Sequence, residues 1–221
     1  IVRSLVGSEM CIRDRTIVAG HGAGEEFSMG GAFSVSAGIG GSDTGGSVFI
    51  KSGYGSTSTS GSITTSTMNG GEMGASGRVE FTTGSSSSGN TGSVLIATGT
   101  ADIGGGGAIE VSVGAGDSGH GGSITVTAGD TSQSDKTGGS ISIHAGDGTG
   151  ICNGCGGHVA ITAGQGYTSS GGSCWITSGY GAKYSSGNMT IATANAGIAG
   201  VSGHLIISTG TASNGNSGLI N

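Results

Sequence analysis

The residues best suited to metal or redox chemistry lie in one short stretch, GICNGCGGH at residues 150–158. Two residues separate Cys152 from Cys155, and His158 follows three residues later. This spacing suits zinc, but a structural zinc site needs four ligands, and His144 would lie roughly 13 Å away along the strand direction. A local disulfide between Cys152 and Cys155 in an oxidising compartment is the favoured prediction, with free thiols as the alternative.

Acidic residues and histidines are spread along the chain without a shared spacing. Calcium-binding nonapeptide repeats are similar in having Asp in Gly-rich turns, but that family places an Asp in every turn, and most turns here have none. Ordinary turn chemistry therefore explains these acidic residues better. The five His residues occupy different places, and no repeat pairs a nucleophile with a base. We expect no catalytic residue, no metal or cofactor and no enzyme activity. The turn residues are Asp102, Asp117, Asp130 and Asp147.

Two further features concern modification and ligand binding. Asn188 begins the only Asn-x-Ser/Thr sequence and is the candidate for N-glycosylation. The many Ser and Thr residues leave room for O-linked sugar as well. Thr125 and Thr127 form an outward Thr-x-Thr pair, of the kind that binds ice when it repeats regularly. Charged and bulky residues interrupt the same two columns elsewhere, so ice binding is an alternative function.

All of these residues lie within, or between, copies of an eight-residue motif. It begins with Gly, has apolar residues third and fifth and a small residue seventh, and usually ends with Gly, as in GSITVTAG at 122–129. Connectors rich in Gly, Ser, Asp and Asn join one motif to the next. The motif begins at residues 31, 46, 61, 77, 92, 107, 122, 139, 157, 172, 187, 203 and, truncated, 218.

Alternation with period two predicts that each motif is a half-buried β-strand. The connectors are too short for a helical crossover, and their nearly constant length favours stacked coils over a hairpin meander. We therefore predict an all-β fold, a parallel β-solenoid with one strand per repeat and coils of about 15 residues. Residues such as Val94 and Ile96 would form inward ladders. Small residues such as Gly40 would let the opposite wall approach them.

The other face of the predicted solenoid carries apolar residues at the fourth motif position. They are Phe49, Leu95, Trp175 and Ile206. Scattered apolar residues on a surface are normal, but their recurrence on one face predicts lateral packing against another solenoid or against glycan. Uncapped ends of stacked coils would also pair with other chains.

Composition excludes two classes of partner. The net charge is −6 and only 9% of residues are charged, so no basic patch could bind nucleic acid. No apolar run reaches the ~20 residues of a membrane span. Self-association, with attached glycans, is therefore the predicted kind of interaction.

Two parts of the sequence resemble known sequences. RSLVGSEMCIRDR, residues 3–15, resembles translated sequencing adapter and lacks the apolar core of a signal peptide. We therefore treat residues 1–15 as foreign and predict a solenoid of about thirteen repeats over residues 16–221, as a fragment of a longer chain. Strings such as GGSISI-AG and SGN-TIATA resemble Gly/Ser/Thr-rich repeat proteins of diatoms and related algae, which implies an extracellular, structural context. We predict a fibre-forming extracellular or cell-surface protein, with a surface adhesin as another alternative.

Overall fold

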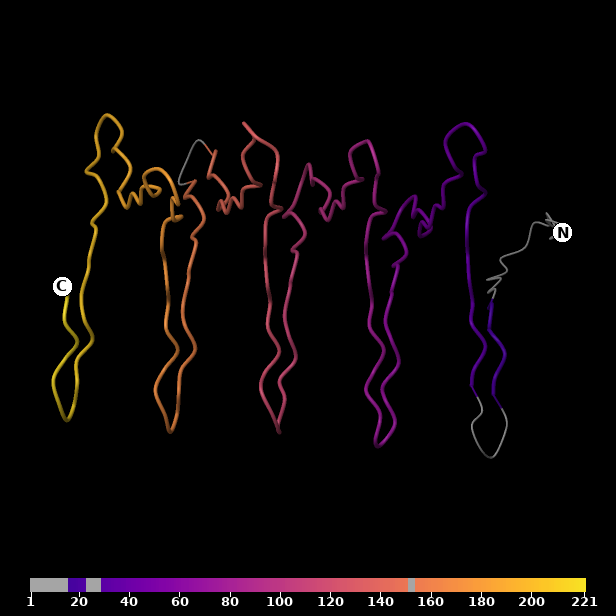
Figure 1. The fold of residues 1–221 in the computed structure, drawn as a ribbon, viewed down its shortest axis with the longest axis horizontal. Helices are drawn as coiled ribbons and strands as arrows, with labels where there is room; N and C mark the ends of the chain where they lie inside the picture. Colours follow the sequence, from indigo (N-terminus) through magenta and orange to yellow (C-terminus); the bar gives the residue numbers. More distant parts are fainter. Residues whose placement is uncertain (1–15, 23–28, 151–153) are drawn as a thin grey trace. The chain divides into compact units, whose positions relative to one another are not determined.

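The computed structural model describes residues 16–22, 29–150 and 154–221 (Figure 1). Over these residues the chain forms no helix and no β-strand. The predicted parallel β-solenoid is therefore wrong: without strands there is neither a sheet nor a stack of coils. In the same residues no helix is both long and apolar enough to cross a membrane. The chain divides into two units, Ile1–Glu110 and Val111–Asn221, which are described separately below.

The repeat nevertheless sets the local conformation of the chain. Long extended stretches of chain alternate with bent and looped segments (Figure 1). Among the described residues, a positive φ occurs only at Gly104, Gly119, Asp135 and Gly215, all of them in connectors. Most connectors also bend at their third to fifth residues. These bends lie at 41–43, 56–58, 87–89, 102–104, 117–119, 167–169, 182–184 and 213–215.

The first unit contains two kinds of junction between consecutive motifs. In a closed junction, the N–H of the Gly that begins a motif donates a hydrogen bond to the carbonyl oxygen of the Gly that ends the previous motif. Within the described part of this unit, no such bond forms at the remaining junctions, which we call open. The closed pairs are Gly31–Gly20, Gly46–Gly38 and Gly61–Gly53, with N···O distances of 2.8–3.0 Å. The open junctions precede Gly77, Gly92 and Gly107.

The second unit repeats this division. Four of its junctions are closed, again with N···O distances of 2.8–3.0 Å, and three described junctions lack the bond. The closed pairs are Gly139–Gly129, Gly157–Gly146, Gly172–Gly164 and Gly187–Gly179. The open junctions precede Gly122, Gly203 and Gly218.

The seventh motif residue separates the two kinds of junction without exception. Every closed junction follows Ala or Ser, and every open junction follows a β-branched residue. Connector length does not make the distinction, because seven-residue connectors occur in both groups, at 39–45 and 85–91 for example. The residues before closed junctions are Ala19, Ala37, Ser52, Ala128, Ala145, Ala163 and Ser178. Those before open junctions are Thr67, Thr83, Thr98, Val113, Thr193 and Thr209.

The space around the leading Gly explains the rule. At closed Gly172, the position that a Cβ atom would occupy is 3.4 Å from the backbone nitrogen of Gly164 and 3.6 Å from the Ala163 Cβ. At open Gly107, the same position is 3.3 Å from the Thr98 Cγ2 methyl carbon, and no backbone atom lies within 4 Å. The extra methyl group therefore occupies the space through which the two glycine backbones would meet.

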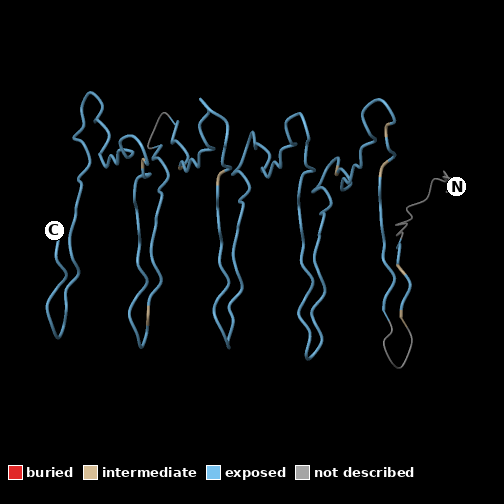
Figure 2. Cartoon of the chain, viewed as in Figure 1, coloured by how far each residue is buried: buried red, intermediate tan, exposed pale blue. Residues whose placement is uncertain are grey.

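Partial burial in the described residues is confined to closed junctions (Figure 2). No described residue is buried. Some Ala residues before the last Gly, and some Gly residues two places after it, are half-buried. These half-buried residues are Ala19, Gly22, Ala37, Gly40, Gly55, Ala128, Ala145, Gly166 and Gly181.

The structure also corrects the predicted role of the small residues that follow each motif. They do not face an opposite wall. A Cβ on Gly166 would lie 2.5 Å from the carbonyl oxygens of Ser169 and Ser170, in the same connector, and a Cβ on Gly40 would contact the Asp43 carbonyl oxygen. Glycine is suited to this position because the connector folds back over it.

The predicted inward ladders do not form either. Val94 is 58% exposed and Ile96 is 73% exposed. Each repeat offers two or three apolar side chains, worth on the order of 4–6 kcal/mol if fully buried. Ordering the backbone costs about 1–2 kcal/mol per residue. One 15-residue repeat cannot offset its own ordering, so the apolar residues of a single chain stay uncovered.

Candidate functional site

The candidate site is the series of apolar side chains at the third and fifth motif positions, which we call the apolar pairs. Within the apolar pairs, third-position side chains are the less exposed, as at Val79 with 47%. Fifth-position side chains are more exposed, as at Val126 with 71%. The alternation read from the sequence is therefore present as a difference in exposure, although no pair is buried. A regularly spaced apolar surface of this kind can bind a partner that repeats at the same interval.

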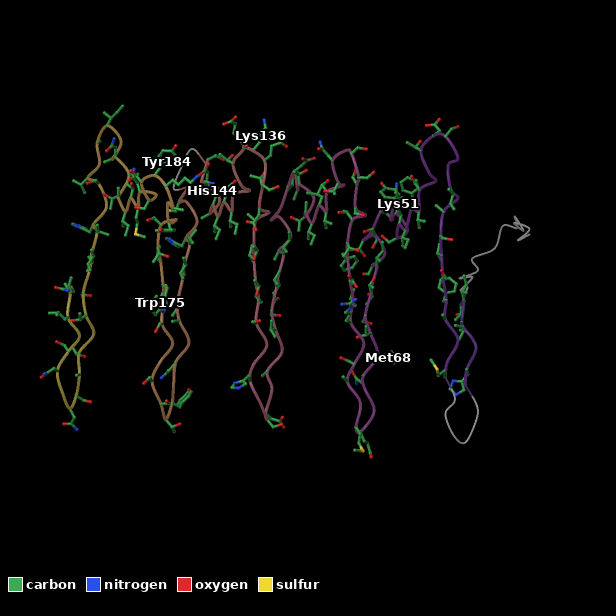
Figure 3. The ribbon with its side chains drawn as sticks, in the orientation of Figure 1. Lys51, Met68, Lys136, His144, Trp175 and Tyr184 are labelled. Atoms are coloured by element: carbon green, nitrogen blue, oxygen red, sulfur yellow. The ribbon has the colours of Figure 1, made fainter. Side chains whose placement is uncertain are left out.

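The four predicted lateral-contact residues are more exposed than the apolar pairs of their motifs. Phe49, Leu95, Trp175 and Ile206 are 81–86% exposed. Figure 3 shows Trp175 on a drawn-out motif, away from the looped connectors. The structure places these side chains in solvent, as the alternation predicts, and their lateral contacts remain a prediction.

The motif backbone is as unpartnered as the apolar pairs. Over the described residues, backbone hydrogen bonds occur only at the closed junctions and in two tight turns, from Gly74 to Gly71 and from Gly200 to Gly197. The amide and carbonyl groups within the motifs make no backbone hydrogen bond there. Exposed chains with free amide and carbonyl groups tend to pair with other chains. The motifs thus present apolar side chains and free backbone groups together.

Two contacts between side chains were missed by reasoning from the sequence. The Ser142 hydroxyl and His144 Nε2 lie 2.6 Å apart in a hydrogen bond, so one repeat does pair a nucleophile with a base. Arg78 and Glu80 form an exposed ion pair. In both cases the partners are two residues apart, and the period-two alternation places such residues on one face. The period-two alternation was therefore the sequence signal from which these two side-chain pairs could have been predicted.

The Ser142–His144 pair lacks the surroundings that an active site needs. Both residues are exposed, and Figure 3 shows His144 among the looped segments of the chain. The described residues form no pocket that could hold a substrate. A catalytic Ser–His pair also needs a third group to orient the base, and none is hydrogen-bonded to His144 among the described residues.

The structure describes only one of the two cysteines of the predicted disulfide. Cys152 lies outside the described residues, so the predicted Cys152–Cys155 disulfide stays a prediction. Cys155 and Cys174 are both exposed. Cys174 lies at a third motif position, where the period-two alternation predicts an inward side chain, so that prediction is wrong for Cys174. No group of three His, Cys, Asp or Glu residues able to hold a metal occurs in the part of the chain that the structure describes.

The modification and ice-binding candidates are accessible. Asn188 is exposed at the second motif position, directly after Gly187. Thr125 and Thr127 are exposed as well. Glycosylation at Asn188 and ice binding through the two threonines both remain predictions.

Comparison of the chain with protein-family models, with curated proteins and with solved structures gives no match. The exposed apolar pairs and the unpartnered motif backbone are the features of the described residues that bear on function.

Proposed function

We propose that the chain is a structural, fibre-forming repeat protein of the cell surface or extracellular space, without catalytic activity. One observation carries the proposal: the apolar pairs recur in every complete motif except 61–68, which has Thr65 at its fifth position, and they remain about half exposed or more throughout the described residues. A second copy of the chain has the same spacing and can cover every pair at once. Covering one Val or Ile side chain contributes about 1.5–3 kcal/mol.

The charge of the chain supports association with itself. With a net charge of −6 over 221 residues and 9% charged residues, electrostatic repulsion between copies is small. Each repeat binds its counterpart weakly, but repeats joined in one chain act at high effective concentration. Association along the whole chain is therefore strong even though one repeat is not stable alone. The extracellular setting is supported by the exposed Asn188 sequon.

Association should depend on the apolar pairs first. Phe49, Leu95, Trp175 and Ile206 would add lateral contacts in the four repeats that carry them. Free motif amide and carbonyl groups would form hydrogen bonds between copies, so that assembly satisfies the backbone as well as the side chains.

The experiment is sedimentation velocity over a dilution series, with electron microscopy of the concentrated sample. In the test variant, Val94→Thr, Ile96→Thr, Ile109→Thr and Val111→Thr remove two apolar pairs without changing β-branching. The matched control, Ala97→Thr with Ser112→Thr, changes the sixth position of the same two motifs. Four side chains at about 1.5–3 kcal/mol each amount to several kcal/mol, so we expect the test variant to need more than about a hundredfold higher concentration to associate.

Three outcomes bear on the proposal. Wild-type chain that remains monomeric at every concentration contradicts it. Equal association by the test variant and the control shows that the apolar pairs are not the contact surface. A second variant replaces the four fourth-position residues, by Phe49→Thr, Leu95→Thr, Trp175→Thr and Ile206→Thr. If this variant loses association and the test variant does not, the contact surface is the fourth motif position and not the apolar pairs.

A further inference from the structure

All four tyrosines of the chain lie in connectors, and none lies in a motif. Their exposed fractions are 89–93%, so each phenol ring is almost wholly in solvent. The residues beside them are mostly Gly, Ser and Thr, which leave the rings open to approach. The four residues are Tyr54, Tyr167, Tyr180 and Tyr184.

The connectors that carry tyrosine all lead to closed junctions. Tyr54 lies in the connector closed by the Gly61–Gly53 hydrogen bond, and Tyr167 in that closed by Gly172–Gly164. Tyr180 and Tyr184 share the connector closed by the 3.0 Å bond from the Gly187 N–H to the Gly179 carbonyl oxygen. The hydrogen bond holds the two ends of each connector together, so each of these tyrosines lies in a loop whose ends are joined.

The geometry of one connector brings the backbone of one tyrosine near that of another. The chain bends at residues 182–184, and the carbonyl oxygen of Tyr184 lies against Gly181, where a Cβ would contact it. The backbone of Tyr184 therefore folds back to the residue that follows Tyr180. Figure 3 shows Tyr184 on this looped connector, apart from the drawn-out motif that carries Trp175.

We propose that the connector tyrosines are sites of oxidative phenol coupling, with Tyr180 and Tyr184 as the intrachain pair. An external haem peroxidase with hydrogen peroxide removes one electron and one proton from each phenol. The two phenoxyl radicals form a carbon–carbon bond between their ortho positions, and each ring then regains aromaticity by moving its ortho hydrogen to oxygen. In total, two phenols lose two hydrogen atoms, and one hydrogen peroxide is reduced to two waters.

Coupling between chains rests on the proposed function, because it needs copies of the chain to assemble. Tyr54 and Tyr167 have no second tyrosine in their own connectors, so their coupling partners lie elsewhere, in the assembled state on another copy. Such bonds would make a non-covalent fibre permanent. Intrachain coupling of Tyr180 with Tyr184 needs no assembly and tests the site by itself.

The test uses the full chain with its thiols alkylated. It is treated with a haem peroxidase and hydrogen peroxide and analysed by tandem mass spectrometry of proteolytic fragments. At low concentration we expect a fragment in which Tyr180 and Tyr184 are joined with the loss of two hydrogen atoms, in a yield independent of dilution. Tyr184→Phe should abolish it. The matched control Tyr167→Phe should retain it.

A variant of the connector tests whether the fold positions the pair. Gly181→Ala adds a Cβ that meets the Tyr184 carbonyl oxygen, so the connector must shift. The yield of the Tyr180–Tyr184 bond should then fall roughly threefold to tenfold. This is the factor by which the loss of one net hydrogen bond changes an equilibrium constant. A yield unchanged by Gly181→Ala, or no greater than that of Tyr54 with Tyr180 in the same dilute sample, overturns the proposal.

Assembly is followed separately by light scattering before oxidant is added, which keeps the two proposals distinguishable. A chain that assembles without forming the Tyr180–Tyr184 bond contradicts the coupling site alone. A chain that forms this bond but stays monomeric contradicts the fibre alone.

Discussion

Closed and open junctions differ consistently in the residue at the seventh motif position, which is Ala or Ser before every closed junction and Thr or Val before every open one. The connector 165–171 follows Ala163, and its ends are held by the 2.9 Å bond between the Gly172 N–H and the Gly164 carbonyl oxygen. The connector 100–106 has the same length, follows Thr98, and has no such bond. A β-branched residue at the seventh motif position is the feature that all six open junctions share and all seven closed junctions lack.

Serine shows that the methyl group, rather than the hydroxyl, makes the difference. Ser52 and Ser178 precede closed junctions, whereas Thr83 precedes an open one. Val113, which has no hydroxyl, also precedes an open junction, and its Cγ1 is 2.6 Å from the Cβ position of Gly122. At Thr67 the hydroxyl donates to the Gly77 carbonyl oxygen at 3.2 Å, so a side-chain bond takes the place of the backbone bond.

The largest effect should come from filling the space inside a closed connector. Gly166→Ala places a Cβ where the carbonyl oxygens of Ser169 and Ser170 lie 2.5 Å away, so the connector has to open. We expect the Gly172 amide to exchange with solvent about threefold to tenfold faster, the protection due to one net hydrogen bond. Amide exchange measured by NMR on the dispersed chain reads this directly.

The control for this change is Gly164→Ala in the same junction. A Cβ on Gly164 has nothing within 4 Å, so the Gly172 amide should keep its protection. Equal acceleration in both variants would mean that any added methyl group opens the connector.

A smaller opening is expected from Ala163→Thr, which changes only the residue before the last Gly. The new methyl group should separate Gly172 from Gly164 as Thr98 separates Gly107 from Gly99. Exchange at Gly172 should rise by about threefold, at the low end of the range for one hydrogen bond. Ala163→Ser is the matched control and should leave exchange unchanged, whereas equal exchange in both would argue against a role for the methyl group.

The converse change should close an open junction. Thr98→Ala removes the methyl carbon that lies 3.3 Å from the Cβ position of Gly107, and we expect the Gly107 amide to gain protection of about threefold or less. The gain is smaller because the connector 100–106 has Ala101 where every closed connector except 130–138 has Gly. Thr98→Val keeps the branch and should stay open; protection appearing in that variant would contradict the rule.

The smallest effect is expected from side chains on the motif surface. The Arg78 and Glu80 side chains are 82% and 50% exposed, and exposed ion pairs contribute about 0.2–1 kcal/mol or less. Arg78→Gln should leave exchange at Gly92 unchanged by NMR. A measurable change there would show that junctions respond to more than the residue before the last Gly.

The sequence predicted the period and the alternation, and both are visible in the structure. Bends recur at one place in the connectors, and third-position residues such as Val79 are less exposed than fourth-position residues such as Leu95. The stacking of repeats was not predictable from these signals. A periodic apolar pattern requires a partner but does not say whether that partner is the next repeat or another chain.

Whether a junction is closed or open correlates with the residue at the seventh motif position, but this correlation is recognised only when the structure is known. Ala163 and Thr98 both satisfy the requirement for a small seventh residue, and nothing in the period distinguishes them. Their difference matters only once the leading Gly is known to approach that side chain. The Ser142–His144 pair follows from the alternation alone and could have been found by comparing residues two positions apart.

The most direct test of the account is to observe all thirteen junctions in one NMR experiment on the isotope-labelled, dispersed chain. Scalar couplings across hydrogen bonds connect a donor nitrogen with the acceptor carbonyl carbon. We expect couplings at the seven junctions that follow Ala or Ser and none at the six that follow Thr or Val. Couplings distributed without regard to that residue, or present at both Gly172 and Gly107, would contradict the account.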